Sequence, residues 1–185
     1  MKTYIALLRG INVSGQKKIL MKDLSSLFES LGFMNVQTYI QSGNVLFQDK
    51  NKNVKELIIL IEKKIVEVFG FEVIVFIRSK EELKTIIQSN PFFKKDLNRI
   101  YISFLNEFKK NPDLTEIEKV KIKGEELIVQ GKEIYFFSPK GYGVSKLSNN
   151  FLEKKLHVSA TTRNWKTVVT LSELSRVRRW RLDSC

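Results

Sequence analysis

The order of predicted strands and helices repeats once along this chain, and the repeat limits the fold more than any other feature of the sequence. The stretch YIALLRG, which begins at Tyr4, resembles YISFLNE, which begins at Tyr101. Farther along each half, TYIQSGNVLFQ from Thr38 resembles LIVQGKEIYFF from Leu127. In both halves a strand is followed by a helix, a hairpin and a second helix. The sequence therefore predicts two related halves of mixed helix and strand.

The first half has the pattern strand, helix, two strands, helix, strand. Apolar residues spaced by three and four predict its helices, and short apolar runs bounded by turn residues predict its strands. Asn53 and Glu56 have the spacing of a capping box at the start of the second helix. This order is the ferredoxin-like, or split βαβ, arrangement. The expected strands are 2–8, 36–40, 45–48 and 71–77, and the expected helices are 21–31 and 52–69.

The second half follows a connecting helix at 79–89, which Ser79 is expected to cap and which ends before Asn90-Pro91. The predicted fold class is α+β, with duplicated ferredoxin-like halves, antiparallel sheets and an extra C-terminal helix. The expected strands of the second half are 99–105, 126–129 and 133–138, and its expected helices are 111–120, 149–156 and 164–175. The predicted division is 1–78 for the first half, 79–98 for the connecting helix and loop, 99–175 for the second half and 176–185 for a tail.

The tail differs from the rest of the chain in its basic residues. Residues 1–175 contain 24 Lys and 4 Arg, whereas residues 176–185 contain 4 Arg and no Lys. This abrupt change predicts a tail that is disordered or foreign to the protein, such as an added or frame-shifted segment. A native basic tail that binds a polyanion is the alternative. The formal net charge of the whole chain is +12, which suits a nucleic acid, an acidic ligand or a surface covered with lysine.

The scarcity of sulfur and histidine excludes several kinds of site. One cysteine, Cys185, allows neither an intrachain disulfide nor a cysteine metal cluster. The single histidine, His157, is expected to be solvated or to cap a helix rather than to catalyse. Spacing identifies no catalytic residues, no metal site and no cofactor. No apolar run is long enough to span a bilayer, and MKTYIALLRG is too short and too polar for a signal peptide, so we expect a soluble cytoplasmic protein of bacterial type without membrane contact.

Three short polar clusters contain the candidate functional residues: RGIN at 9–12, QSGN at 41–44 and TTRNW at 161–165. Each combines side chains that hydrogen-bond through a fixed fork with residues that permit tight turns. The first and third strands of this fold are usually neighbours, so Arg9 is expected near Asn44 and the clusters are expected to form one site. The predicted ligand-binding residues are Arg9, Asn12, Lys17, Gln41, Ser42, Asn44, Arg163 and Asn164.

The first cluster opens a glycine loop that only partly matches a phosphate-binding P-loop. Gly10 and Gly15 have the right spacing, but Lys17 is one place late and Lys18 fills the position of the hydroxyl that would hold magnesium. A looser anion site remains, made by backbone N–H groups, a helix N-terminus and these lysines. The alternative is an ordered turn with surface lysines.

The other two clusters have both a structural and a binding interpretation. Thr161 or Thr162 is expected to cap the last helix, which would place Arg163 at the positive helix end, where it could bind an anion. Arg163 could equally form a structural bridge, and Trp165 is expected to pack. In QSGN, the amides of Gln41 and Asn44 either recognise a ligand or tie down the turn.

Six separated motifs occur in an order that resembles an uncharacterised bacterial family, domain of unknown function 1697. These are YIALLRGINVSG, the helix after it, GFMNVQTYIQSGNVLF, the NPF at 90–92, GYGVSKL and ATTRNWKTV. The resemblance covers about residues 2–175. It implies a duplicated ferredoxin-like fold and no established activity.

Three functions remain open on the sequence. The first is binding of an anionic, phosphate- or carboxylate-bearing small molecule, with or without catalysis. The second is nucleic-acid binding, for which Tyr4 and Phe47 are the aromatic residues on the central strands. The third is a structural or partner-binding role, and the duplicated halves are compatible with a homodimer. The fold alone cannot choose among these functions.

Overall fold

The structure is a computed structural model that describes residues 1–13, 15–50, 52–108 and 110–176. The chain divides into two compact units. Among the described residues, unit 1 comprises Met1–Leu83 and 170–176, and unit 2 comprises Lys84–Val169. Each unit contains a four-stranded antiparallel sheet. The Arg-rich tail predicted at 176–185 lies outside the described residues, except for Arg176.

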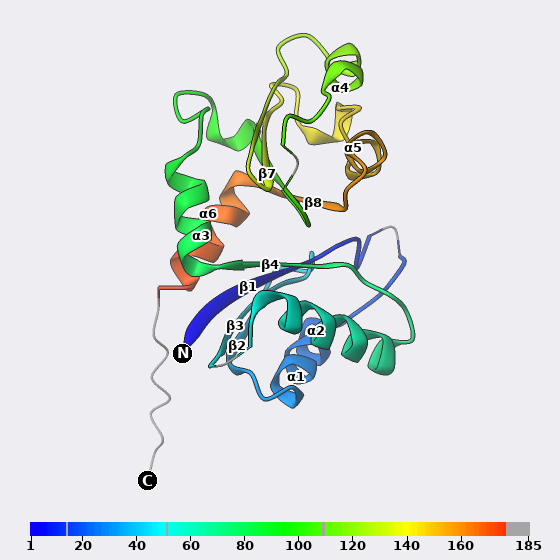
Figure 1. The fold of residues 1–185 in the computed structure, drawn as a ribbon, viewed down its shortest axis with the longest axis vertical. Helices are drawn as coiled ribbons and strands as arrows, with labels where there is room; N and C mark the ends of the chain where they lie inside the picture. Colours follow the sequence, from blue (N-terminus) through cyan, green and yellow to red (C-terminus); the bar gives the residue numbers. More distant parts are fainter. Residues whose placement is uncertain (14, 51, 109, 177–185) are drawn as a thin grey trace. The chain divides into compact units, whose positions relative to one another are not determined.

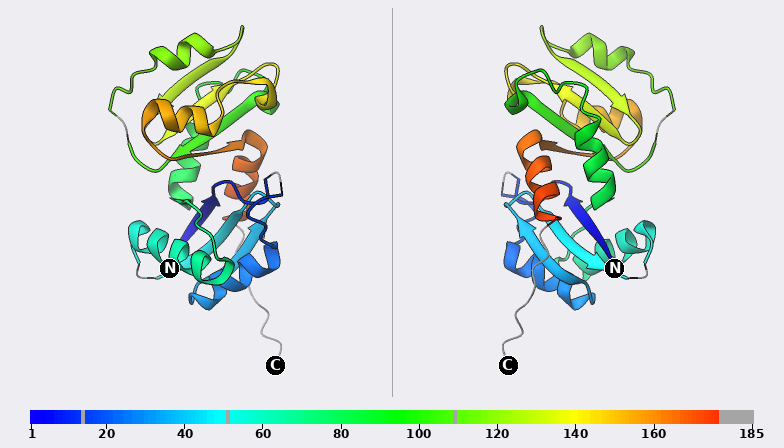
Figure 2. Two further views of the ribbon diagram at one scale, coloured as in Figure 1. Left: turned by 90° about the vertical axis from the view of Figure 1, so that its right-hand side faces the viewer. Right: turned by 90° about the vertical axis from the view of Figure 1, so that its left-hand side faces the viewer.

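Unit 1 has the predicted ferredoxin-like order, with both helices on one face of the sheet (Figures 1 and 2). Its strands lie in the order β2-β3-β1-β4. The edge position of β2 and β4 leaves β1 and β3 in the centre, as expected for this fold. The elements are β1 (Lys2–Leu8), α1 (Met21–Ser30), β2 (Met34–Tyr39), β3 (Asn44–Asp49), α2 (Val54–Phe69) and β4 (Val75–Ser79).

Unit 2 repeats this topology, with strands in the order β6-β7-β5-β8. The duplicated α+β fold is therefore confirmed, including a C-terminal helix. The connecting helix is α3 (Lys80–Gln88), and the helix after β8 is α6 (Trp165–Leu174). The other elements are η1 (Leu97–Arg99), β5 (Ile100–Leu105), α4 (Thr115–Val120), β6 (Glu126–Gln130), β7 (Glu133–Phe137), η2 (Tyr142–Val144), α5 (Asn149–Leu156) and β8 (Ala160–Asn164).

The central strand β1 is buried on both faces. Tyr4, Ala6 and Leu8 pack with the helices α1 and α2 in the core of unit 1. Ile5 and Leu7 point to the opposite face, because side chains alternate along a strand, and both are fully buried. This double burial explains why the YIALL sequence is apolar at every position.

Local capping signals are confirmed at two helices. The Asn53 side chain accepts a hydrogen bond from Glu56 N, and the Glu56 carboxylate accepts one from Asn53 N, so α2 begins with a capping box. Ser79 and Glu82 form the same reciprocal pair before α3. Such caps satisfy backbone N–H groups that have no partner within the helix.

The main differences between prediction and structure concern two predicted elements and one strand that was not predicted. The strand expected at 71–77 begins only at Val75, because its partner β1 ends at Leu8, which pairs with Val75. The helix expected at 111–120 begins at Thr115, whose N–H donates to the Asp113 carboxylate after a left-handed residue at Asn111. The strand β8 was not predicted, and it occupies most of the TTRNW cluster.

No helix in the described part of the chain combines the length and the apolar character needed to cross a membrane. Within the same residues, no three His, Cys, Asp or Glu side chains are grouped closely enough to hold a metal ion. His157 ends α5 in the left-handed conformation and is exposed, as the sequence predicts for a capping histidine.

Candidate ligand-binding site

Three loops meet at one end of the sheet of unit 1, which we call the loop end: residues 9–20, 40–43 and 70–74. Main-chain hydrogen bonds join them to the ends of the strands. Leu8 N donates to Gly43 O over 2.8 Å, and Arg9 N donates to Ile74 O over 3.0 Å. The Lys17 ammonium donates to Glu72 O over 2.6 Å. The first two predicted clusters therefore lie together, as the sequence predicts.

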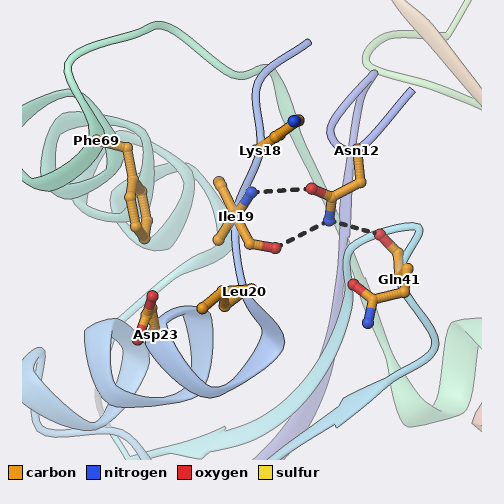
Figure 3. Close-up of a pocket in the computed structure, with 7 residues that line it drawn as sticks. All are labelled: Asn12, Lys18, Ile19, Leu20, Asp23, Gln41 and Phe69. Atoms are coloured by element: carbon orange, nitrogen blue, oxygen red, sulfur yellow. Dashed lines mark hydrogen bonds between the residues drawn. The ribbon is translucent and has the colours of Figure 1, made fainter. Parts of the chain in front are cut away.

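The Asn12 side chain ties the first loop to the hairpin (Figure 3). Its Nδ2 donates to Ile19 O over 3.0 Å and to Gln41 O over 2.9 Å, and its Oδ1 accepts from Ile19 N over 2.9 Å. Both amide hydrogens of Asn12 are therefore used within the protein. Its backbone is left-handed, with φ of 56°, a conformation that asparagine tolerates better than most residues.

The QSGN cluster is held in a similar way. Asn44 is fully buried, and its Nδ2 donates to Tyr39 O and to Ser42 Oγ, each over 3.0 Å. Gly43 has φ of +74°, and a Cβ placed on it would lie 2.7 Å from Ile11 Cδ1. These contacts agree with the structural interpretation, in which the Asn44 amide ties down the turn.

The glycine loop closes on itself rather than forming a P-loop. Asn12 N donates to Lys17 O over 3.2 Å, and Gln16 N donates to Val13 O over 3.0 Å. A P-loop points such N–H groups at a phosphate, whereas here these two are used inside the loop. Another place at this end where an anion could be held is the start of α1.

A cavity of about 260 Å³ opens beside the start of α1. No side chain caps this helix, whose N-cap residue is Leu20. In Figure 3, Asn12 and Gln41 lie on one side of Ile19, and Phe69 and Asp23 lie on the other. The cavity is lined by Asn12, Lys18, Ile19, Leu20, Asp23, Gln41 and Phe69. We call it the loop-end cavity.

Arg163 lies in a strand and not at the start of a helix, which corrects the sequence prediction. It pairs with Ile102 in the ladder between β5 and β8 and is buried. Its Nη1 donates to Thr161 Oγ1 over 2.8 Å and to Thr162 O over 3.0 Å. Burial lowers the pKa of Arg163 to about 10, because a low-dielectric environment disfavours the charged form.

The cap of α6 is Asn164 rather than Thr161 or Thr162. Its Oδ1 accepts a hydrogen bond from Thr167 N over 2.8 Å, which is the geometry of an N-cap. Of the eight predicted residues, six belong to unit 1, and Arg163 and Asn164 belong to unit 2. That all three clusters form one site therefore stays a prediction.

A family model described as "Protein of unknown function (DUF1697)" matches residues 1–135. The chain belongs to this family. A solved structure titled as that of the conserved bacterial protein SP0830 from Streptococcus pneumoniae is similar over 95% of this chain and 99% of that chain, with 25% sequence identity and a TM-score of 0.74. No curated protein matches the chain.

The DUF1697 match ends within β7, so the GYGVSKL and ATTRNWKTV motifs lie beyond it. Sequence reasoning missed a part-buried polar network in unit 2, which is centred on Thr162 of the ATTRNWKTV motif. The Thr162 hydroxyl lies 2.7 Å from Ser103 Oγ and donates to Asn149 Oδ1 over 2.6 Å. Tyr142 OH donates to the same hydroxyl over 3.4 Å. A polar network of this kind fixes strand register.

Sequence reasoning also missed the equivalence of two buried arginines in the two halves. Arg78 pairs with Ile5 on β1, and Arg163 pairs with Ile102 on β5. Each donates through Nη1 to the carbonyl oxygen of the preceding residue over 3.0 Å. The alignment of Tyr4 with Tyr101 would have brought the two arginines into register had the strand β8 been recognised.

Proposed function

We propose that the protein binds a small molecule bearing a phosphate or carboxylate group at the loop end of unit 1. The proposal is carried by one observation: α1 begins without a side-chain cap, at a cavity of about 260 Å³ lined by Lys18. Backbone N–H groups in the first turn of a helix have no intrahelical partner, and the helix dipole favours negative charge there. A lysine beside such a helix start adds a full positive charge.

The residues of the loop end divide into those that form the frame and those that meet the ligand. Asn12, Gly43 and Asn44 hold the loops together, because their polar groups or close contacts are internal. The exposed side chains of Lys18 and Gln41 are the groups we assign to ligand contact. A rigid frame lowers the ordering cost of binding.

The other lining residues restrict the ligand. Leu20 and Phe69 provide an apolar wall. Asp23, in the first turn of α1, also lines the cavity and partly offsets the helix dipole. A suitable ligand therefore combines an anionic group for Lys18 with a hydroxyl or amino group for Asp23. Sugar phosphates and amino acids have this combination.

The remaining predicted residues have more distant roles in this proposal. Arg9 and Lys17 add positive charge to the first loop, and Ser42 supports the hairpin through Asn44. A shared ligand for Arg163, Asn164 and the loop end stays a prediction from the sequence.

Nucleic-acid binding by base stacking is not favoured by the positions of the aromatic residues. Tyr4 and Phe47 are buried in the core beneath the helices of unit 1. Stacking on a base requires an exposed ring face. The net charge of +12 also suits a polyanion. Short RNA is therefore included in the test below, although polyanion binding is not the proposal.

A ligand screen by thermal unfolding tests the proposal. Nucleotides, sugar phosphates, amino acids, carboxylates and short RNA would be added to the full chain at low and moderate salt. A ligand at about 100 times its Kd stabilises by about 2.7 kcal/mol. We expect a small anion to stabilise with little salt dependence, and Lys18→Ala to remove the effect.

Lys22→Ala is the matched control, because Lys22 lies in α1, is exposed and does not line the cavity. It should retain the ligand effect. Stabilisation by RNA alone, lost steeply with salt, would replace the proposal with nucleic-acid binding. An equal loss in both lysine variants, or no stabilisation by any compound, would also reject it, and in the latter case concentration-dependent mass would test the partner-binding role.

A further inference from the structure

The strand β6 forms one edge of the unit 2 sheet, because it pairs with β7 and with no other described strand. The two-residue turn after it makes Gln130 and Glu133 a pair that exchanges both main-chain hydrogen bonds. Such pairs alternate along an antiparallel ladder. Leu127 and Val129 therefore direct their N–H and C=O groups away from β7. We call this free side of the strand the β6 edge.

The repeat shows that the same edge is interrupted in the other half. The strand orders β2-β3-β1-β4 and β6-β7-β5-β8 place β2 at the position that β6 has in unit 2. The register of β2 with β3 shifts between Met34 and Gln37, and Asn35 between them is left-handed, with φ of 52°. An irregularity of this kind keeps an edge strand from pairing with another chain.

The β6 edge lacks this protection. The pairing of β6 with β7 runs without a break from Glu126 to Gln130, and the strand sequence ELIVQ contains neither lysine nor proline. Its one charged side chain, Glu126, lies at the end of the strand and forms an ion pair with Lys95. A regular edge without such protection is a template for a further strand.

The side chains of β6 also suit an added strand. Leu127 and Val129 pack in the core of unit 2. Ile128 points to the opposite face, because side chains alternate along a strand, and it is 37% exposed. A strand added at the β6 edge would place a side chain directly opposite Ile128, at about 5 Å between the Cβ atoms.

We propose that the β6 edge pairs with the β6 edge of a second copy of this chain, antiparallel and with a two-fold axis at Ile128. In this register Leu127 lies opposite Val129 of the second copy. Because the main-chain groups of both residues point outward, each such pair can exchange both hydrogen bonds. The two sheets then join into one continuous sheet, by the mode in which an extended strand is added to a sheet edge.

Side-chain pairing favours a second copy as the partner and selects this register. The two Ile128 side chains face each other, and apolar cross-strand pairs stabilise a sheet. Glu126 lies opposite Gln130 of the second copy, so no like charges meet. Moving the axis to Leu127 or to Val129 would place Ile128 opposite Glu126 or Gln130 instead, and would lose the apolar pair.

The dimer is expected to be weak. A strand of five residues offers less contact area than the roughly 1,200 Å² below which interfaces are usually transient. The net charge of +12 on each copy opposes association, and salt screens this repulsion. Added salt should therefore strengthen the dimer, whereas it would weaken binding to a polyanion. The β6 edge belongs to unit 2, so the dimer does not depend on the function proposed for the loop end.

Amide hydrogen exchange of the full chain, followed by NMR at low and high protein concentration, tests the pairing without any substitution. We expect exchange at Leu127 and Val129 to slow as the concentration rises, because only the dimer bonds these amides. The amide of Ile128 should be protected at both concentrations, since it bonds to β7. Exchange at Leu127 and Val129 that is independent of concentration up to the millimolar range would overturn the proposal.

Sedimentation equilibrium on variants tests the register. Ile128→Lys and Ile128→Glu each place like charges opposite each other at the two-fold axis, so each should raise the Kd of the dimer about tenfold or more. An equimolar mixture of the two variants should restore the dimer, because opposite charges then meet across the axis. Circular dichroism should show that both variants remain folded, since Ile128 lies outside the core.

Ile59→Lys is the matched control, because Ile59 is 65% exposed on α2 of unit 1 and its replacement adds the same charge. It should dimerise like the original chain. An undiminished dimer in Ile128→Lys would overturn the proposal, and so would an equal loss in Ile59→Lys. A mixture of the two Ile128 variants that stays monomeric would reject the two-fold register.

Discussion

Replacement of Gly43 by alanine should destabilise unit 1 through two separate effects. The backbone at Gly43 is left-handed, with φ of +74°. A Cβ at this position would lie 2.7 Å from Ile11 Cδ1 and 2.9 Å from both Ile11 Cγ1 and Leu8 Cβ. Leu8 and Ile11 are buried, so neither can move without disturbing the core.

The two effects can be estimated independently. A non-glycine residue in the left-handed region costs about 1–2 kcal/mol. Forcing an additional carbon atom into a packed core costs a further 1–3 kcal/mol, roughly. The expected loss in the free energy of unfolding is therefore about 2–5 kcal/mol, a large part of the stability of a typical domain.

Urea unfolding of Gly43→Ala and Gly10→Ala separates these effects. Gly10 also has positive φ, at +69°, but a Cβ there would meet no atom within 4 Å. Gly10→Ala should therefore show only the conformational cost, and the difference between the two variants should be about 1–3 kcal/mol. Equal losses in the two variants would refute the contact argument. Gly43→Ala should also displace Ile11. We therefore expect this variant to lose the thermal stabilisation by a ligand of the loop-end cavity.

Three further predictions concern groups in unit 1. Asn12→Asp keeps an acceptor for Ile19 N but removes two donors, so we expect a loss of about 2–3 kcal/mol in urea unfolding. Ile40→Gly should raise the melting temperature, because Ile40 is β-branched, has φ of 51° and is 48% exposed. Glu62 is half-buried and accepts from Val75 N, and burial raises its pKa although this hydrogen bond lowers it in part. Because the folded pKa is above 4.5, the charged form costs stability at neutral pH, so Glu62→Gln should be more stable there and lose this advantage as the pH falls toward 4.5.

Each of these predictions has a control at a similar position. Asn35→Asp, which loses a single exposed side-chain bond, should cost much less than Asn12→Asp. Ile74→Gly removes an exposed isoleucine without positive φ and should not stabilise. Glu67→Gln, on the exposed side of α2, removes an ion pair with Lys64 and should not be more stable than the original chain at neutral pH. A stabilising Ile74→Gly, or a Glu62→Gln advantage that grows at low pH, would contradict the reasoning.

Most of the helices and strands could be predicted from short-range signals in the sequence. The capping pairs at Asn53 and Ser79 each satisfy backbone groups within four residues, so they are readable from local sequence. The α5 helix was predicted with its observed bounds, because its cap and its apolar spacing are also local. The repeated order of elements then identified the duplicated fold, since few topologies accept that order.

The strand β8 shows where local reasoning fails. Thr161, Thr162 and Arg163 look like a helix start because a helix does follow them. Their strand conformation comes from pairing with β5, which lies about sixty residues earlier in the chain. Long-range pairing cannot be read from a cap signal, and burial of Arg163 follows from this pairing.

The fold class, and the meeting of RGIN and QSGN at one end of a sheet, could be predicted from sequence patterns. How their side chains are used depends on the packing of the folded chain. The amides of Asn12 and Asn44 donate to main-chain or hairpin acceptors, whereas Lys18 lines the loop-end cavity. The physical reason is that a donor forms its hydrogen bond with the acceptor that the folded chain places within about 3 Å. That distance depends on the packing of segments far apart in the sequence.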